Sequence, residues 1–258
     1  MKKSTLLFSA LLAFQVLPVV SQPAFAQSDS PAALDPTAMY ASQFDAARLR
    51  QEYASANSRK NFPGARQGPY TYEMLTDTTV SLVAGTHVKT QQKETRALDK
   101  QGRTRIDYTF PNLQRTIIVD PLAKAVYLVC PESQEVLRLT GAALDAPASA
   151  APVKPSLDDK HTTSTSLGEK DVGGVKAFGS RSEIVTPAGT QGNDKDIVSV
   201  TELWFSLELG TPVYLRTASP LFGETFTRIE NLKFADVPAS TFVLPAGYTV
   251  RDIALAQQ

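Results

Sequence analysis

Residues 199–224, SVTELWFSLELGTPVYLRTASPLFGE, hold the single tryptophan of the chain, Trp204, within two runs of bulky and β-branched residues. The runs are separated by LELG at 207–210 and followed by a second turn-like segment, SPLFGE. Apolar runs bounded by turn residues are typical of paired β-strands. Large aromatic side chains in such strands serve either a packed core or the wall of a ligand cavity. The stretch therefore indicates the fold class and leaves the function open.

The segments around this stretch continue the same pattern. Gly173 and Gly174 can take the positive φ angles of a tight turn, which predicts a hairpin between the strands on either side. Strands are also expected in residues 196–206, 211–217 and 226–234. They recur about every ten to fifteen residues without strand–helix–strand repeats, so the sequence predicts a meandering antiparallel sheet.

The first half of the chain shows strand patterning from residue 70 onward. In residues 70–82 every second side chain falls on one face, including Tyr72 and Met74, and residues 105–110 alternate in the same way. Residues 115–129 predict a hairpin that turns at Asp120-Pro121, and another turn is expected at 131–134. We therefore expect a run of adjacent antiparallel strands in this half as well.

The N-terminus has the three parts of a secretory signal peptide. Lys2 and Lys3 precede an apolar stretch from residue 6 to residue 20, and Ala24-Phe25-Ala26 forms a small-x-small cleavage site. We expect cleavage after Ala26 and a periplasmic or secreted mature protein. No later stretch is long and apolar enough for a membrane helix, so the mature protein is expected not to span a membrane.

The mature chain is predicted to divide into three parts. Residues 27–66 comprise a disordered start and an amphipathic helix within 36–60, whose apolar side includes Met39, Tyr40 and Phe44. Residues 67–251 form a single antiparallel β domain, interrupted by a disordered loop at 141–166 that is rich in Ala, Pro, Ser and Thr. Residues 252–258 form a tail.

Charge and motif content exclude several functions. Removal of Lys2 and Lys3 leaves 24 basic and 26 acidic residues, which gives no overall attraction to nucleic acid. The only cysteine, Cys130, lies in an apolar run and is expected to be buried and inert. His87 and His161 show no metal-ligand spacing, and no Gly-x-Ser-x-Gly elbow accompanies them. We therefore predict no metal site, no cofactor and no catalytic residue.

One local excess of charge lies between residues 86 and 115. This segment contains seven basic and three acidic residues, which gives a local charge of +4. The segment is either a rim for anionic headgroups or the solvated outer face of two strands. The basic residues are Lys89, Lys93, Arg96, Lys100, Arg103, Arg105 and Arg115.

The second half of the chain resembles the LolA/LolB-like group of outer-membrane lipoprotein carriers and sorting proteins. The matching features are the Trp204 strand, a Gly-Thr-Pro start at 210–212, Asn231, and a closing Pro-x-x-x-Phe-x-x-Pro-x-Gly-Tyr at 238–248. The segments GPYTYEMLTDTT and TIIVDPLAKAVYLV are similar to the first half of uncharacterised secreted members. The resemblance spans about residues 68–251. It implies a half-barrel, a strongly curved antiparallel sheet with an N-terminal helix as cover.

The resemblance further implies an apolar cavity, which in the carriers binds the acyl chains of lipoproteins. We accordingly expect a non-catalytic protein that binds a lipid or an acylated protein in such a cavity. The alternative is an envelope interaction or sensing module with a packed core, which binds a protein partner through its outer sheet or the 141–166 loop. A hydrolase is the third and weakest reading. The expected cavity residues are Tyr72, Met74, Tyr108, Tyr127, Trp204, Tyr214 and Phe226.

Overall fold

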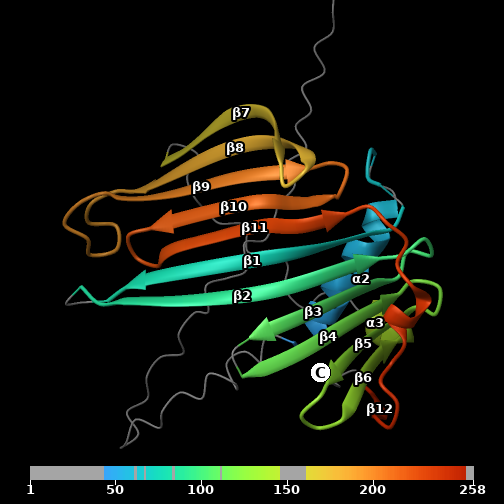
Figure 1. The fold of residues 1–258 in the computed structure, drawn as a ribbon. Coiled ribbons are helices and arrows are strands. Elements are labelled where there is room, and N and C mark those ends of the chain that lie inside the picture. The colour runs from blue at the N-terminus through green and yellow to red at the C-terminus, as the bar shows by residue number, and fades with distance from the viewer. Residues whose placement is uncertain are drawn as a thin grey trace, which may run out of the picture.

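In the part of the chain that the structure describes, twelve strands form one curved sheet, in the order β12-β6-β5-β4-β3-β2-β1-β11-β10-β9-β8-β7 (Figure 1). The computed structural model describes residues 44–60, 63–66, 68–82, 85–110, 112–145 and 161–253. The strands of the first half are β1 Tyr70–Ser81, β2 His87–Leu98, β3 Thr104–Phe110, β4 Leu113–Asp120, β5 Ala125–Cys130 and β6 Glu135–Thr140. The others are β7 Thr162–Val172, β8 Val175–Thr186, β9 Ile197–Ser206, β10 Thr211–Ser219, β11 Gly223–Lys233 and β12 Thr249–Asp252.

Eleven of the twelve described strands form two antiparallel meanders. One runs from β1 to β6 and the other from β7 to β11, and the pairing of β1 with β11 joins them. Gly173 and Gly174 form the β7–β8 turn with positive φ angles of 60° and 87°, as the sequence predicts. The predicted fold class, mainly β with an N-terminal helix over a curved antiparallel sheet, is confirmed.

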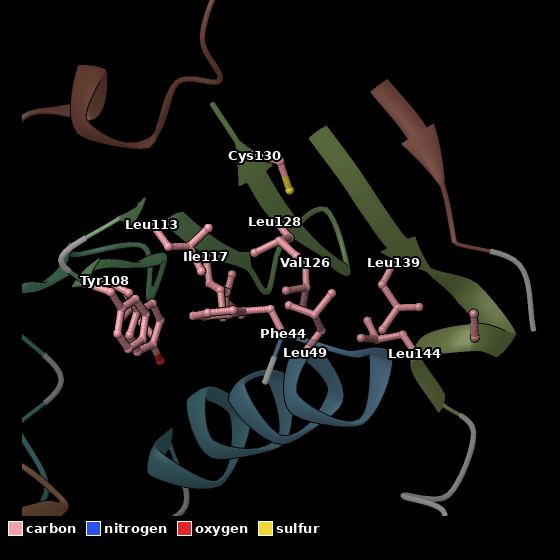
Figure 2. Packing of buried hydrophobic residues seen from close by; sticks show 14 residues of the cluster. Phe44, Leu49, Tyr108, Leu113, Ile117, Val126, Leu128, Cys130, Leu139 and Leu144 are labelled. Atoms are coloured by element: carbon pink, nitrogen blue, oxygen red, sulfur yellow. The ribbon is translucent and has the colours of Figure 1, made fainter. Parts of the chain in front are cut away.

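The helix α2, Ala46–Lys60, lies across one face of the sheet and packs on β4 and β5. It begins after Asp45, whose Oδ1 accepts a hydrogen bond from the backbone N–H of Arg48 at 2.8 Å, an N-terminal cap. Phe44, two residues before the helix, and Leu49 of the helix point into the buried side chains of the strands (Figure 2). Met39 and Tyr40, expected on the same side of the helix, lie outside the described residues.

A large hydrophobic cluster fills the space between α2 and the strands. Its members are almost fully buried, so this part of the helix-side face is a packed core. The short helix α3, Gly141–Asp145, closes one end of the cluster with Ala143 and Leu144. The strand residues of the cluster are Ile106, Tyr108, Phe110, Leu113, Ile117, Val119, Val126, Leu128, Cys130 and Leu139.

The opposite, outer face carries a smaller cluster. Ala97 and Ile118 are covered there by Phe242 from the 3-10 helix η2, Ala239–Phe242. Arg105 of β3 connects η2 to the sheet, because its Nη1 donates a hydrogen bond to the carbonyl oxygen of Thr241 at 2.9 Å. The segment after β11 thus crosses the outer face before it reaches β12.

Two expectations about the sheet are corrected. The strand at the C-terminus, β12, pairs parallel with β6, whereas the sequence predicted only antiparallel neighbours. The reason is that the chain crosses the outer face from β11 to the far edge before it pairs. The predicted loop at 141–166 is too wide, because α3 occupies 141–145 and β7 begins at Thr162. Residues 162–166 lack apolar alternation because both faces of this edge strand are solvent-facing.

Residues 146–160 of that segment, and the signal peptide, lie outside the described residues. In the part of the chain that the structure describes, no helix has both the length and the apolarity to cross a membrane. The proposed division into domains stays a prediction.

Candidate functional site

A buried polar cluster connects α2 to the sheet. Glu52 of the helix forms ion pairs with Arg48 at 2.8 Å and with Arg96 of β2 at 3.6 Å. Arg96 also pairs with Glu94 of the same strand. The Arg48 guanidinium donates a hydrogen bond of 2.7 Å to the hydroxyl of Tyr108, whose O–H lies 3.4 Å from Glu52 Oε1. Every charge of the cluster therefore has an opposite partner.

The partners of Arg96 determine its protonation. Burial disfavours its cation, but the carboxylates of Glu94 and Glu52 outweigh burial and hold the Arg96 pKa well above its usual value. Burial, with the same two carboxylates adding to it, raises the pKa of the Tyr108 hydroxyl. The phenol therefore stays neutral, and the ion pairs of Glu52 with Arg48 and Arg96 attach the helix to the sheet.

Beyond α2, the helix-side face presents two rows of side chains, which we name the hydroxyl rows. Residues paired directly across neighbouring strands share a face, so the rows follow from the register. Their central members are half-buried. The first row contains Thr90, Thr78, Thr225, Thr217, Thr201, Ser182 and Ser164. The second contains Gln92, Thr76, Thr227, Leu215, Leu203, Ser180 and Ser166.

Hydroxyl groups within these rows contact one another. The Oγ1 atoms of Thr76 and Thr227 lie 3.0 Å apart, and those of Thr78 and Thr225 lie 3.4 Å apart. Threonine also carries a methyl group, and Leu203 and Leu215 add apolar surface to the second row. The surface is therefore mixed, with methyl groups beside hydrogen-bonding oxygens.

Four of the seven predicted cavity residues fall in one hydrophobic cluster. Tyr72 and Trp204 are buried in it, and Met74 and Tyr214 are partly buried against it. The cluster extends to the β7–β8 turn, where Gly173 lies so close to Ile229 that a Cβ would come within 2.7 Å of its side chain. Tyr70, in the same cluster, has a buried hydroxyl without a hydrogen-bond partner among the described residues.

The other three predicted residues lie elsewhere. Tyr108 is buried in the cluster beneath α2, and Tyr127 packs against the outer-face cluster. Phe226 makes an edge-to-face contact with Tyr214, with ring centroids 5.0 Å apart. The structure therefore does not bring all seven residues to one site, because they occupy different faces and different clusters.

A pocket of about 290 Å³ opens on the outer face, beneath the segment that carries Pro245 and Tyr248. Its walls include Arg105, Asp107 and Arg115. These charged groups are paired with one another or with a neighbour. Arg105 Nε donates a hydrogen bond to Asp107 Oδ2 at 2.9 Å, and Arg115 forms an ion pair with Glu132. The pocket is polar and has no uncompensated charge among these residues, so it is a weaker candidate for an apolar ligand.

Six of the seven basic residues of the segment 86–115 have carboxylate partners. Lys93 pairs with Glu73, Lys100 with Asp236 and Arg103 with Asp99. Arg96, Arg105 and Arg115 have the carboxylate partners described above. Acidic residues from other strands and from outside the segment supply several of these partners, which a local count of charge does not include.

The histidines and the cysteine occupy ordinary structural positions. His87 begins β2 and is exposed, with Nδ1 3.0 Å from Ser81 Oγ, and His161 is exposed beside β7. Cys130 is buried in the α2 cluster as predicted, and burial raises the pKa of its thiol. Among the described residues, no group of three or more His, Cys, Asp or Glu is placed to hold a metal ion.

The hydroxyl rows were not predicted from the sequence. A signal was present in the Thr-x-Thr patterns of 76–78 and 225–227, which place two threonines on one face of a strand. The alignment of these threonines across strands depends on register, and the sequence does not specify it.

No protein-family model matches the chain, and no curated protein matches its sequence. Solved structures do resemble it. An uncharacterized conserved protein from Thermus thermophilus shares 8% identity over 78% of this chain and 98% of that one, with a TM-score of 0.41. The LolA superfamily protein NE2245 from Nitrosomonas europaea shares 10% identity over 74% of this chain and 97% of that one, with a TM-score of 0.34.

A third similar structure is the Pseudomonas aeruginosa MucA/MucB complex, at 13% identity and a TM-score of 0.39. The match covers 81% of this chain and 64% of that one. A LolA superfamily protein is thus among the structures that this chain resembles. Because identities and TM-scores are low, function has to be argued from the residues of this chain.

Proposed function

We propose that this protein is an exported, non-catalytic protein that binds a lipid or another apolar ligand against the open part of its helix-side face. The observation that carries this proposal is the pair of hydroxyl rows, whose half-buried threonines and leucines extend beyond α2. A ligand with an acyl chain and polar oxygen atoms matches this mixed surface. The acyl chain of a lipoprotein is one such ligand.

The energetics favour a chain of moderate length. Each methylene that leaves water contributes about 0.8 kcal/mol, so a chain that covers Leu203, Leu215 and the threonine methyl groups can bind without any charged contact. Hydroxyl groups beside it can donate to ester or carboxyl oxygens. The buried hydroxyl of Tyr70 in the neighbouring cluster has no hydrogen-bond partner among the described residues, and a polar ligand atom can satisfy it.

Native mass spectrometry of the mature protein, purified from its own envelope fraction, tests the proposal. We expect an added mass that extracts into organic solvent as a lipid. If the protein carries the bare polypeptide mass and takes up no palmitic acid or lipopeptide, the proposal is wrong.

Replacement of Thr217 with tryptophan is expected to weaken palmitate binding at least tenfold. Thr217 lies in the middle of the first hydroxyl row, and an indole there would occupy the space of the ligand. Arg216→Trp is the matched control, because the neighbouring residue of the same strand points to the opposite face. Binding is measured by titration with a fluorescent fatty acid. Equal affinities of the two variants would place the ligand elsewhere.

A second function, binding of an envelope protein, is favoured by one observation. Leu82 at the end of β1 and Leu221 and Phe222 in the β10–β11 turn are 49%, 52% and 54% exposed. The two turns are neighbours, because Thr79 pairs with Glu224 next to Gly223. Exposed apolar groups that lie together are typical of interaction sites.

Replacement of Phe222 with serine is expected to reduce recovery of such a partner several-fold in cross-linking from intact cells. The loss of a large apolar contact would weaken the complex, whereas fatty-acid uptake should not change. Val243→Ser is the control, since Val243 is 64% exposed and lies in the segment that crosses the outer face. Identical cross-linked products from the wild type and both variants would count against this second function.

A further inference from the structure

The edge of the sheet formed by β7 has an unusual composition. β7 is the last strand in the order and pairs only with β8 among the described strands. Its first five residues, Thr162–Ser166, all carry hydroxyl groups, and none is charged. Nearly every side chain of the strand is exposed, so no described element covers it. An unpaired edge of this kind is a template for another strand.

The rest of β7 is protected against such pairing. Leu167 is an extra residue that creates a bulge between Ser166 and Gly168, and bulges bend an edge away from a partner. The charged residues that follow, Glu169 and Lys170, already contact other side chains of the same chain. Glu169 pairs with Lys176 at 2.6 Å, and the Lys170 ammonium lies 3.8 Å from the centre of the Trp204 ring.

The other edge of the sheet is protected as well. β12 has only four residues, Thr249–Asp252. Arg251 pairs with Glu135 at 2.9 Å, and Asp252 pairs with Arg138 at 2.7 Å. Short, charged strands are ordinary protection for an edge. Among the described strands, the unprotected edge backbone therefore lies in one place, residues 162–166.

We infer that two copies of this chain associate by antiparallel pairing of Thr162–Ser166, which continues the sheet from one copy into the other. The segment is complementary to itself. With Ser164 on the two-fold axis, Thr163 faces Thr165 and Thr162 faces Ser166 of the second copy. Each cross-strand pair then joins two hydroxyl residues, and no charge is left opposite an uncharged group.

The same kind of contact already exists inside the molecule. Hydroxyl residues meet across neighbouring strands at Thr76–Thr227, and Ser199 Oγ donates to Ser219 Oγ at 3.1 Å. Such pairs stabilise antiparallel strands, whereas a charged or fully apolar partner strand would leave the hydroxyls of β7 unmatched. A second copy is thus the occupant that fits the edge best.

The inference is tested with the mature chain by sedimentation velocity over a range of concentrations. The wild type is expected to dimerise reversibly. Ser164→Lys and Ser164→Glu should each weaken self-association at least tenfold, because like charges would face each other across the axis. An equimolar mixture of the two variants should recover the dimer, since the introduced ammonium of one chain then faces the introduced carboxylate of the other.

The control is Thr90→Lys, which adds the same charge to an exposed residue at the other end of the first hydroxyl row. This variant should dimerise like the wild type. Three results would overturn the inference: a monomeric wild type at the highest concentration, failure of the mixture to recover the dimer, or dissociation caused equally by Thr90→Lys. Recovery in the mixture also shows that both variants fold.

Discussion

Replacement of Glu52 with alanine is expected to lower the free energy of unfolding by about 3–5 kcal/mol. Glu52 is 7% exposed and is the helix residue that both Arg48 and Arg96 contact. Its removal leaves two partly buried guanidinium groups with one fewer carboxylate, and Tyr108 loses a neighbour as well. The penalty of an uncompensated buried charge exceeds the value of the pair itself, so the loss should be large.

The measurement is urea unfolding followed by circular dichroism, with Asp252→Ala as the matched control. Asp252 also accepts a paired hydrogen bond from an arginine, Arg138, but its side chain is 61% exposed. An exposed pair contributes little to stability, because water and salt screen its charges. If Glu52→Ala costs no more than Asp252→Ala, the buried cluster does not hold α2 to the sheet.

A selective effect on α2 would be a second signature of the cluster. The contacts of Glu52 described above lie within the helix and between the helix and β2–β3. Amide hydrogen exchange in Glu52→Ala should therefore rise first in α2 and in the strands beneath it. This loss of order would change ligand access to the helix-side face without altering the hydroxyl rows.

Much of the fold could be predicted from the sequence because strand alternation and turn residues are local signals. Tyr70 and Tyr72 are buried on one face of β1, and the glycine pair at 173–174 turns β7 into β8. The parallel pairing of β12 could not be predicted, since it depends on a long crossing of the outer face. β7 was predicted only in part, because a strand exposed on both faces has no apolar period.

The site was harder to predict than the fold. In the sequence, nothing distinguishes Glu52 and Arg96 from charged residues on the solvent-exposed surface. Only the packing of α2 on the sheet brings them together away from solvent. Apart from Met74, the predicted cavity residues are large aromatic side chains in strands. Such residues are also what a core requires, and the register distributes Tyr108 and Tyr127 between different faces.

Trp204→Ala is the second substitution with a large expected effect, a loss of about 3–5 kcal/mol in the free energy of unfolding. Trp204 is 5% exposed, and its ring lies over Gly179, where a Cβ would come within 2.8 Å of three ring carbons. Its Nε1 donates a hydrogen bond of 2.7 Å to Glu202. Removal of the indole would leave a cavity between β8 and β9 that neighbouring side chains cannot fill.

The same variant decides whether Trp204 is a core residue or contacts the ligand, so stability and binding have to be measured together. Unfolding is followed by circular dichroism, because the chain has no other tryptophan to report by fluorescence. Trp204→Phe, which keeps an aromatic ring over Gly179, should recover most of the lost stability, and Lys170→Met should cost only about 1 kcal/mol through the cation–π contact. If Trp204→Ala instead unfolds like the wild type and loses fatty-acid binding, the indole contacts ligand. Loss of stability with fatty-acid affinity retained below the unfolding transition would make Trp204 a core residue, and the ligand would then lie along the hydroxyl rows.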